Sequence, residues 1–280
     1  MIIMNRYKLI LIASMSGSIL IGCDNTTSEK QFANEIVNSM ILVKGGRFQM
    51  GDFGPLVDEK LPFSPEQDNK PLHWVELTSF KISKNKVTWG DFNKWLKLNG
   101  RDTNHYYQWA TKESTSERFK KTTGDDYPAS VNWNDANAFC TWIGEVSGKS
   151  ITLPTEAQWE YAARSRGQFL QFANSDNQYN PDNSDDKLNF THDMAPVGSY
   201  PPNPLGLYDM MGNGNEWMSD WYSEDYYKNS PEKNPQGPEK GGQKVIRGYL
   251  GSMFGLYDIT RGKSKPDYEG PSDGFRCVEN

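Results

Sequence analysis

The spacing of apolar residues changes along the chain, and each spacing predicts a different element. Short apolar runs on either side of Gly45 and Gly46 predict two strands, at 40–43 and 48–50, and further strand is expected near 74–76 and at 80–82. Thr88 precedes apolar residues at helical spacing, so we expect a helix to begin there, with one apolar face made of Trp89, Phe92, Trp95 and Leu96.

The middle of the chain predicts two helices close together in sequence. The segment 131–135 supplies an Asx-type start for a helix whose apolar face contains Ala136, Phe139, Cys140, Trp142 and Ile143. Thr155 with Gln158 forms a capping box, so a second helix should run to about Arg164. Regular patterns then fade over 167–200 and 226–242, where long irregular loops indicate function, metal binding or cross-linking. Short strands are expected at 244–247 and 274–278.

The N-terminal segment is interpreted as a secretion signal. Arg6 and Lys8 precede a run without acidic or basic side chains over 9–22, which is shorter than the roughly 20 apolar residues of a membrane span. Its end, 20–23, resembles the lipobox of bacterial lipoproteins, which implies that Cys23 is diacylated. The alternative is an ordinary signal peptide with an incidental cysteine. Asp24 resembles the residue that keeps enteric lipoproteins in the inner membrane.

These observations predict three parts of the chain. Residues 1–22 form the lipoprotein signal peptide, residues 23–39 form a lipidated N-terminus and flexible tether, and residues 40–280 form one domain. The expected location is a membrane surface that faces the periplasm, with the inner membrane favoured in an enteric-like host.

Composition excludes one class of partner. The chain has 36 acidic and 30 basic residues and a formal charge of -6, and no dense cluster of lysine and arginine interrupts this balance. We therefore expect no nucleic-acid partner. Aromatic residues make up 13% of the chain, so the core should depend on large rings.

Five sequence blocks, taken in order, resemble the signature blocks of the formylglycine-generating enzyme (sulfatase-modifying factor) family. They lie at 40–51, 131–135, 153–164, 206–217 and 274–277. The resemblance covers about 40–280, and ordered blocks are far more specific than any single motif. It implies an α+β fold that is related to C-type lectin folds, rich in loops and poor in regular secondary structure.

The resemblance also implies structural calcium. The family's calcium ligands correspond here to Asp209, Gly212, Gly214 and Glu216, and acidic oxygens with inward-turned glycine carbonyls suit calcium. The alternative is a glycine-rich turn with two solvated acids. A second, less secure site corresponds to Asn174, Ser175, Asn189 and Thr191.

The resemblance assigns the two cysteines of the domain as well. A helix cysteine pairs with a C-terminal cysteine in the family, and the matching residues are Cys140 and Cys277. An oxidising compartment allows such a bond to persist. Two buried free thiols are the alternative.

The enzymes of the family oxidise a substrate cysteine with copper held by active-site thiolates. The corresponding stretch here, 247–258, contains no cysteine, and thiolates are what select Cu(I), so no copper is expected. We therefore favour a catalytically degenerate, calcium-stabilised binding module for an envelope protein or glycan, such as an accessory subunit or a toxin-immunity protein. The alternative is an oxidoreductase with altered metal ligands around Met253, His192 or Asp258; His73 is interpreted as structural.

Overall fold

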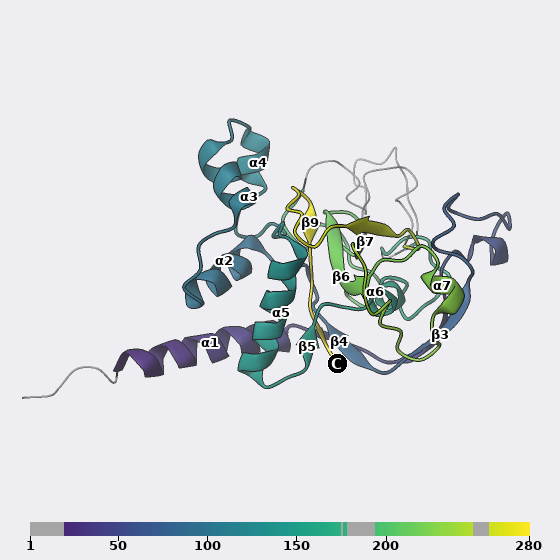
Figure 1. The fold of residues 1–280 in the computed structure, drawn as a ribbon, viewed down its shortest axis with the longest axis horizontal. Coiled ribbons are helices and arrows are strands. Elements are labelled where there is room, and N and C mark those ends of the chain that lie inside the picture. Colours follow the sequence, from purple (N-terminus) through teal and green to yellow (C-terminus); the bar gives the residue numbers. More distant parts are fainter. Residues whose placement is uncertain (1–19, 175, 178–193, 249–257) are drawn as a thin grey trace, which may run out of the picture.

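The computed structural model describes residues 20–174, 176–177, 194–248 and 258–280, and of residues 20–25 only the backbone. The described helices and strands are mixed along the chain without a repeating unit (Figure 1). Long connections join them, and this confirms the expected loop-rich α+β fold.

Three small sheets support the molecule. The first has the order β1-β4-β10-β5 and joins both ends of the domain; the second pairs β2 with β3; the third has the order β8-β7-β6-β9, in which β6 and β9 are parallel. The strands are β1 (Ile41–Val43), β2 (Gly46–Met50), β3 (His73–Leu77), β4 (Phe80–Ile82), β5 (Ile151–Thr152), β6 (Asn215–Trp221), β7 (Lys244–Arg247), β8 (Gly262–Ser264), β9 (Asp273–Gly274) and β10 (Val278–Glu279).

The helices begin where the sequence places their caps. The side chain of Thr88 accepts a hydrogen bond from Asp91 N, and the capping box of Thr155 and Gln158 is complete. The predicted helices are therefore confirmed as α2 (Trp89–Leu98), α5 (Trp133–Ser147) and α6 (Glu156–Ala163). Short helical turns were not predicted: η1 (Gly54–Leu56), α3 (His105–Gln108), η2 (Trp109–Glu113), α4 (Glu117–Lys121) and α7 (Tyr226–Asn229).

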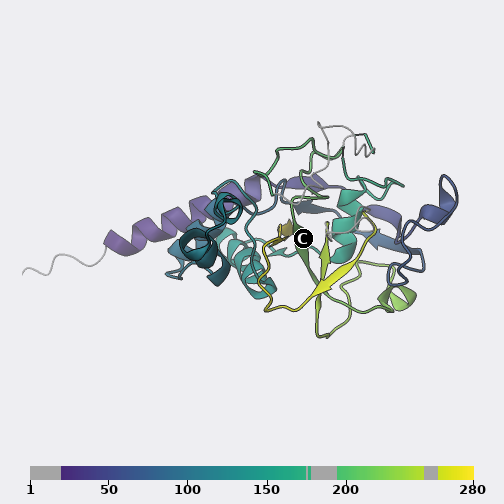
Figure 2. The same ribbon diagram turned by 90° about the horizontal axis from the view of Figure 1, so that it is seen from above.

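The segment expected to be a flexible tether is instead mostly a helix of the domain. Helix α1 (Leu20–Asn38) lies along α5, and its N-terminal end points away from the body of the domain in both views (Figures 1 and 2). Phe32 and Ala33 are buried, and the Phe32 ring contacts Phe139 and Trp142. The apolar residues 32, 33 and 37 give this polar segment one buried face. Among the described residues, no helix combines the length and apolar character of a membrane span.

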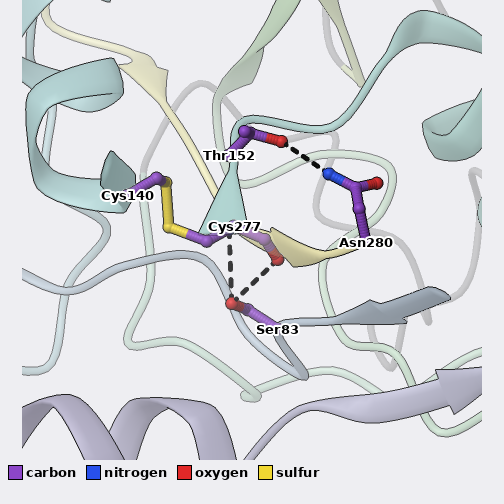
Figure 3. Close-up of a disulfide and its surroundings, with 5 residues drawn as sticks. All are labelled: Ser83, Cys140, Thr152, Cys277 and Asn280. Atoms are coloured by element: carbon purple, nitrogen blue, oxygen red, sulfur yellow. Dashed lines mark hydrogen bonds between the residues drawn. A yellow bond between two sulfur atoms is a disulfide. The ribbon is translucent and has the colours of Figure 1, made fainter. Parts of the chain in front are cut away.

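The disulfide joins α5 to the C-terminal end of the chain. Cys140 of α5 is bonded to Cys277, which precedes β10, and both side chains are fully buried (Figure 3). Ser83 holds Cys277 in place, because its hydroxyl accepts a hydrogen bond from Cys277 N and donates one to Cys277 O. The predicted pairing is confirmed, and the alternative of two free thiols is excluded.

Candidate functional site

The block at 206–217 is a tight turn that leads into β6. Asp209, Gly212, Asn213 and Gly214 all have positive φ angles, which glycine, asparagine and aspartate adopt most readily. A Cβ atom on Gly214 would lie 2.7 Å from the carbonyl oxygen of Ser272. This close approach lets β6 begin beside β9, and it turns the side chain of Glu216 into the interior.

Glu216 is fully buried and accepts four hydrogen bonds. Oε1 accepts from Lys86 Nζ at 2.8 Å and from Arg276 Nη2 at 2.7 Å. Oε2 accepts from Arg276 Nε at 2.7 Å and from Trp159 Nε1 at 3.1 Å. A carboxylate offers about four lone-pair positions, so this group is saturated by protein donors.

The two cations around Glu216 are themselves well satisfied. Arg276 also donates to the carbonyl oxygens of Ser83, Lys84 and Tyr208, while Lys86 Nζ also donates to the carbonyl oxygen of Gly214 at 3.0 Å. Burial alone would raise the pKa of Glu216, but Arg276 and Lys86 lower it below its usual value. We call Lys86, Trp159, Gly214, Glu216 and Arg276 the Glu216 cluster.

The structure therefore brings together only part of the expected calcium ligand set around a cation. Gly214 O and Glu216 Oε1 both contact Lys86 Nζ. Asp209 Oδ2 accepts from Gly198 N at 2.9 Å, and Gly212 N donates to Gly248 O. Within the described residues, no three histidine, cysteine or acidic side chains gather as a metal site would require. The calcium site stays a prediction, and this donor set fits calcium poorly.

A second buried ion cluster lies along α6. Arg247 Nη1 donates to Glu156 Oε1 at 2.7 Å, and Nη2 donates to Glu160 Oε2 at 2.9 Å. Arg261 binds both oxygens of Glu156, at 2.7 and 2.9 Å, and Arg164 binds Glu160 Oε1 at 2.7 Å. We call these five residues the Arg247 cluster. Its three arginines and two glutamates are all buried.

The Arg247 cluster holds the two ends of the stretch that matches the family's active-site segment. Arg247 ends β7, and its Nη2 also donates to the carbonyl oxygen of Asp258. Asp258 N donates to Gln171 O at 3.2 Å. Burial raises the pKa of Asp258 well above its usual value.

The other predicted ligands are only partly described. Asn174 is buried, whereas its proposed calcium co-ligands Ser175, Asn189 and Thr191, and the residues Met253 and His192, lie outside the described residues. The second calcium site and the altered metal site therefore stay predictions. His73 packs edge-on against Tyr227, with ring centroids 4.6 Å apart, and its Nδ1 lies 3.0 Å from Pro71 O, in keeping with a structural role.

Sequence reasoning missed both ion clusters, although one had a readable signal. Glu156, Glu160 and Arg164 recur every four residues, which places them on one face of a helix. Every residue of α6 is buried, so those charges require partners. Lys86 gave no such signal, because an isolated lysine in a loop is usually solvated.

An apolar surface adjoins the Arg247 cluster. The Phe53 ring stacks on Phe169 and meets Phe63 edge-on, both at 5.2 Å between centroids, and Arg164 lies over Phe53. The outer residues remain in contact with solvent: Leu56 is 52% exposed, Leu61 62% and Phe169 41%. We call these three residues the apolar patch; Gln171, the partner of Asp258, follows two residues after Phe169.

Comparisons with known proteins agree with this architecture. The sulfatase-modifying factor enzyme 1-like domain matches residues 25–280, which include most of α1. The formylglycine-generating enzyme of Streptomyces coelicolor is 31% identical, over 86% of this chain and 88% of that protein. The serine/threonine-protein kinase pkn1 of Chlamydia pneumoniae is 33% identical over 88% of this chain, which spans only 38% of that protein.

Among solved structures, PvdO from Pseudomonas aeruginosa superposes with a TM-score of 0.68 and 28% identity, covering 86% of this chain and 94% of that one. The family match extends over 256 of the 280 residues (25–280). The chain therefore belongs to the sulfatase-modifying factor enzyme 1-like family, the family of the formylglycine-generating enzymes.

Proposed function

We propose that this protein is a binding module of the cell envelope, attached to a membrane through a lipid on Cys23, whose domain displays a surface for a protein partner. One observation carries the proposal: Cys140 and Cys277 are joined in a disulfide, and Cys23 is the third of the chain's three cysteines. A domain whose cysteines are bonded to each other has no thiolate to offer copper or a substrate cysteine.

The ion clusters support a scaffold role. The carboxylate of Glu216 accepts four hydrogen bonds from protein donors, and a saturated buried network rigidifies its surroundings. Arg247 fixes the end of β7 and the carbonyl of Asp258 at the same time. Arg247 thus ties together the residues that flank the stretch matching the family's active-site segment, and binding residues are often carried on connections that a rigid scaffold positions.

The apolar patch favours a protein over a glycan as partner. Leu56, Leu61 and Phe169 expose aliphatic and aromatic side chains, and Phe169 lies two residues before Gln171, whose carbonyl oxygen accepts a hydrogen bond from Asp258 N. Contiguous exposed apolar side chains mark protein-binding surfaces, whereas they offer a glycan few hydrogen bonds.

The position of α1 bears on the proposed anchor. Cys23 lies nine residues before Phe32, the first buried residue among those whose side chains the structure describes, and nine helical residues span about 13.5 Å. A lipid on Cys23 would therefore hold the domain close to the membrane surface, and a partner within reach would be a membrane protein or one bound to the membrane.

Site-specific photo-crosslinking tests the proposal. A photoreactive phenylalanine analogue at Leu61 of the full chain, expressed in its own host and irradiated in intact cells, should give a discrete crosslinked protein band. The matched control is the same substitution at Leu42, a 55% exposed leucine in β1 outside the patch. Equal labelling from both positions, or none from Leu61, would refute a partner at the patch. Crosslinks to carbohydrate alone would replace the protein partner with a glycan.

The second candidate function is an oxidoreductase with altered ligands, and the observation that favours it is that the two side-chain oxygens of Asp258 are buried without a hydrogen-bond partner among the described residues. Copper or iron retained by the purified chain, together with oxygen uptake on a cysteine peptide that Asp258→Asn abolishes, would establish that function. Absence of both would leave the binding role.

A further inference from the structure

The Glu216 cluster has the composition of a cation site whose cation belongs to the protein. Lys86 Nζ lies 2.8 Å from Glu216 Oε1 and 3.0 Å from Gly214 O. These are an acidic oxygen and a turned-in glycine carbonyl, the donor types that bind a hard metal ion. All three groups are buried, and the side chains of Lys86 and Glu216 have no exposed surface.

We propose that the ammonium group of Lys86 takes the place of a divalent cation at Glu216 and Gly214, so that the 206–217 turn folds without calcium. This inference concerns the scaffold and stands independently of the proposed binding function.

The count of charges supports the replacement. Glu216 and Asp209 bring two acidic side chains to this turn, and two basic side chains, Lys86 and Arg276, form ion pairs with Glu216. A calcium ion added to this set would place a double positive charge beside two buried cations. Because Glu216 already accepts four hydrogen bonds, that ion would also have to displace a charged donor to gain a ligand oxygen.

The backbone of Val87, the residue after Lys86, is held by two hydrogen bonds, and this helps to position the ammonium group. Val87 N donates to Phe275 O at 2.9 Å, and Val87 O accepts from Ala129 N at 2.9 Å. Phe275 directly precedes Arg276, so the two cations of the cluster are held by neighbouring hydrogen bonds. Because the ammonium group of Lys86 is part of the chain, folding fixes its position, and the turn needs no ion from solution.

The experiment compares the melting temperature and metal content of the full chain in detergent. The wild-type protein, purified with calcium present and then desalted, should contain no stoichiometric calcium by elemental mass spectrometry. Its melting temperature should be the same in calcium chloride and in EGTA. One bound calcium per chain, or a melting temperature that rises with calcium, would overturn the proposal, and this measurement needs no variant.

Two lysine variants test the role of the charge. Lys86→Met should lower the melting temperature by roughly 10 °C, because it leaves a buried charge with one partner fewer. Lys84→Met is the matched control: Lys84 lies two residues away, is exposed, and covers the Tyr208 ring, so its loss should change little. A Lys86→Met protein as stable as wild type would overturn the proposal.

A double variant separates charge from packing. In a Glu216→Gln background the buried negative charge is gone, so Lys86→Met should lower the melting temperature by clearly less than it does in wild type. Equal losses in the two backgrounds would assign Lys86 a packing role and overturn the proposal.

Discussion

The disulfide between Cys140 and Cys277 offers the most quantitative prediction. The two cysteines are 137 residues apart, so the bond closes a loop that includes nearly half of the chain in the unfolded state. The loop-entropy model assigns about 5 kcal/mol to a closure of that length. Removal of native disulfides from small secreted domains costs about 2 to 5 kcal/mol.

The double variant Cys140→Ala, Cys277→Ala should therefore lower the free energy of unfolding by about 3–5 kcal/mol. Both sulfur atoms lie in the fully buried core beside Phe139 and Phe275, so lost packing adds to the loss of the cross-link. Urea titration followed by tryptophan fluorescence measures this free energy. Wild type treated with a reductant should move toward the variant, and its intact mass should increase by two hydrogen atoms.

The control is Cys23→Ala, which removes a cysteine and keeps the disulfide. Its free energy of unfolding in the same detergent should equal that of wild type. A loss of under about 1 kcal/mol in the free energy of unfolding of the double variant would refute the reasoning, because the loop closure and the buried packing would then stabilise the fold far less than expected.

Three further predictions address the ion clusters and α1. Glu156→Gln should destabilise the protein by about 3–5 kcal/mol in urea titration, because two buried arginines lose a shared charge; a loss below about 1 kcal/mol would contradict this. Burial raises the pKa of Asp220 to about 7, above its unfolded value of about 3.9, so folding takes up a proton between these values. The free energy of unfolding should therefore fall as the pH rises from about 4 to 7 and level off above. The variant Asp220→Asn should remove this pH dependence, whereas Asp225→Asn, at an exposed position, should keep it. An unchanged pH dependence in Asp220→Asn would assign the effect to other groups. Phe32→Ala should lower the free energy of unfolding by about 3–4 kcal/mol if α1 is part of the core, while Gln31→Ala, at the neighbouring exposed position, should lower it by under about 0.5 kcal/mol. Equal effects of the two substitutions in calorimetry would instead indicate that this segment is a flexible tether.

Elements with local signals were predictable from the sequence. Thr88 and Thr155 cap their helices through hydrogen bonds to the residue three positions later, and the apolar alternation at 46–50 specifies β2. The ordered sequence blocks then fixed the overall fold and the partner of Cys140, which no local pattern contains. What these features share is that each depends on residues close in sequence or on a recognised order of blocks.

Helix α1 was missed because most of its residues are polar. Its buried face consists of Phe32, Ala33, Ile36 and Val37, few enough that composition alone indicates a solvated segment. The helix forms because α5 offers Phe139 and Trp142 to that face. Tertiary packing, which single-sequence propensity does not contain, decides the conformation here.

The site at Glu216 shows the deeper limit of sequence reasoning. The spacing of Asp209, Gly214 and Glu216 predicts a calcium ion, whereas in the structure Gly214 O and Glu216 Oε1 contact the ammonium group of Lys86. Lys86 lies 130 residues before Glu216, and Arg276 lies 60 residues after it. Only the paired strands and the hydrogen bonds of Val87 bring them there. The motif thus supplies oxygen atoms that can bind a cation, and the rest of the fold determines whether that cation is a metal ion or a side chain.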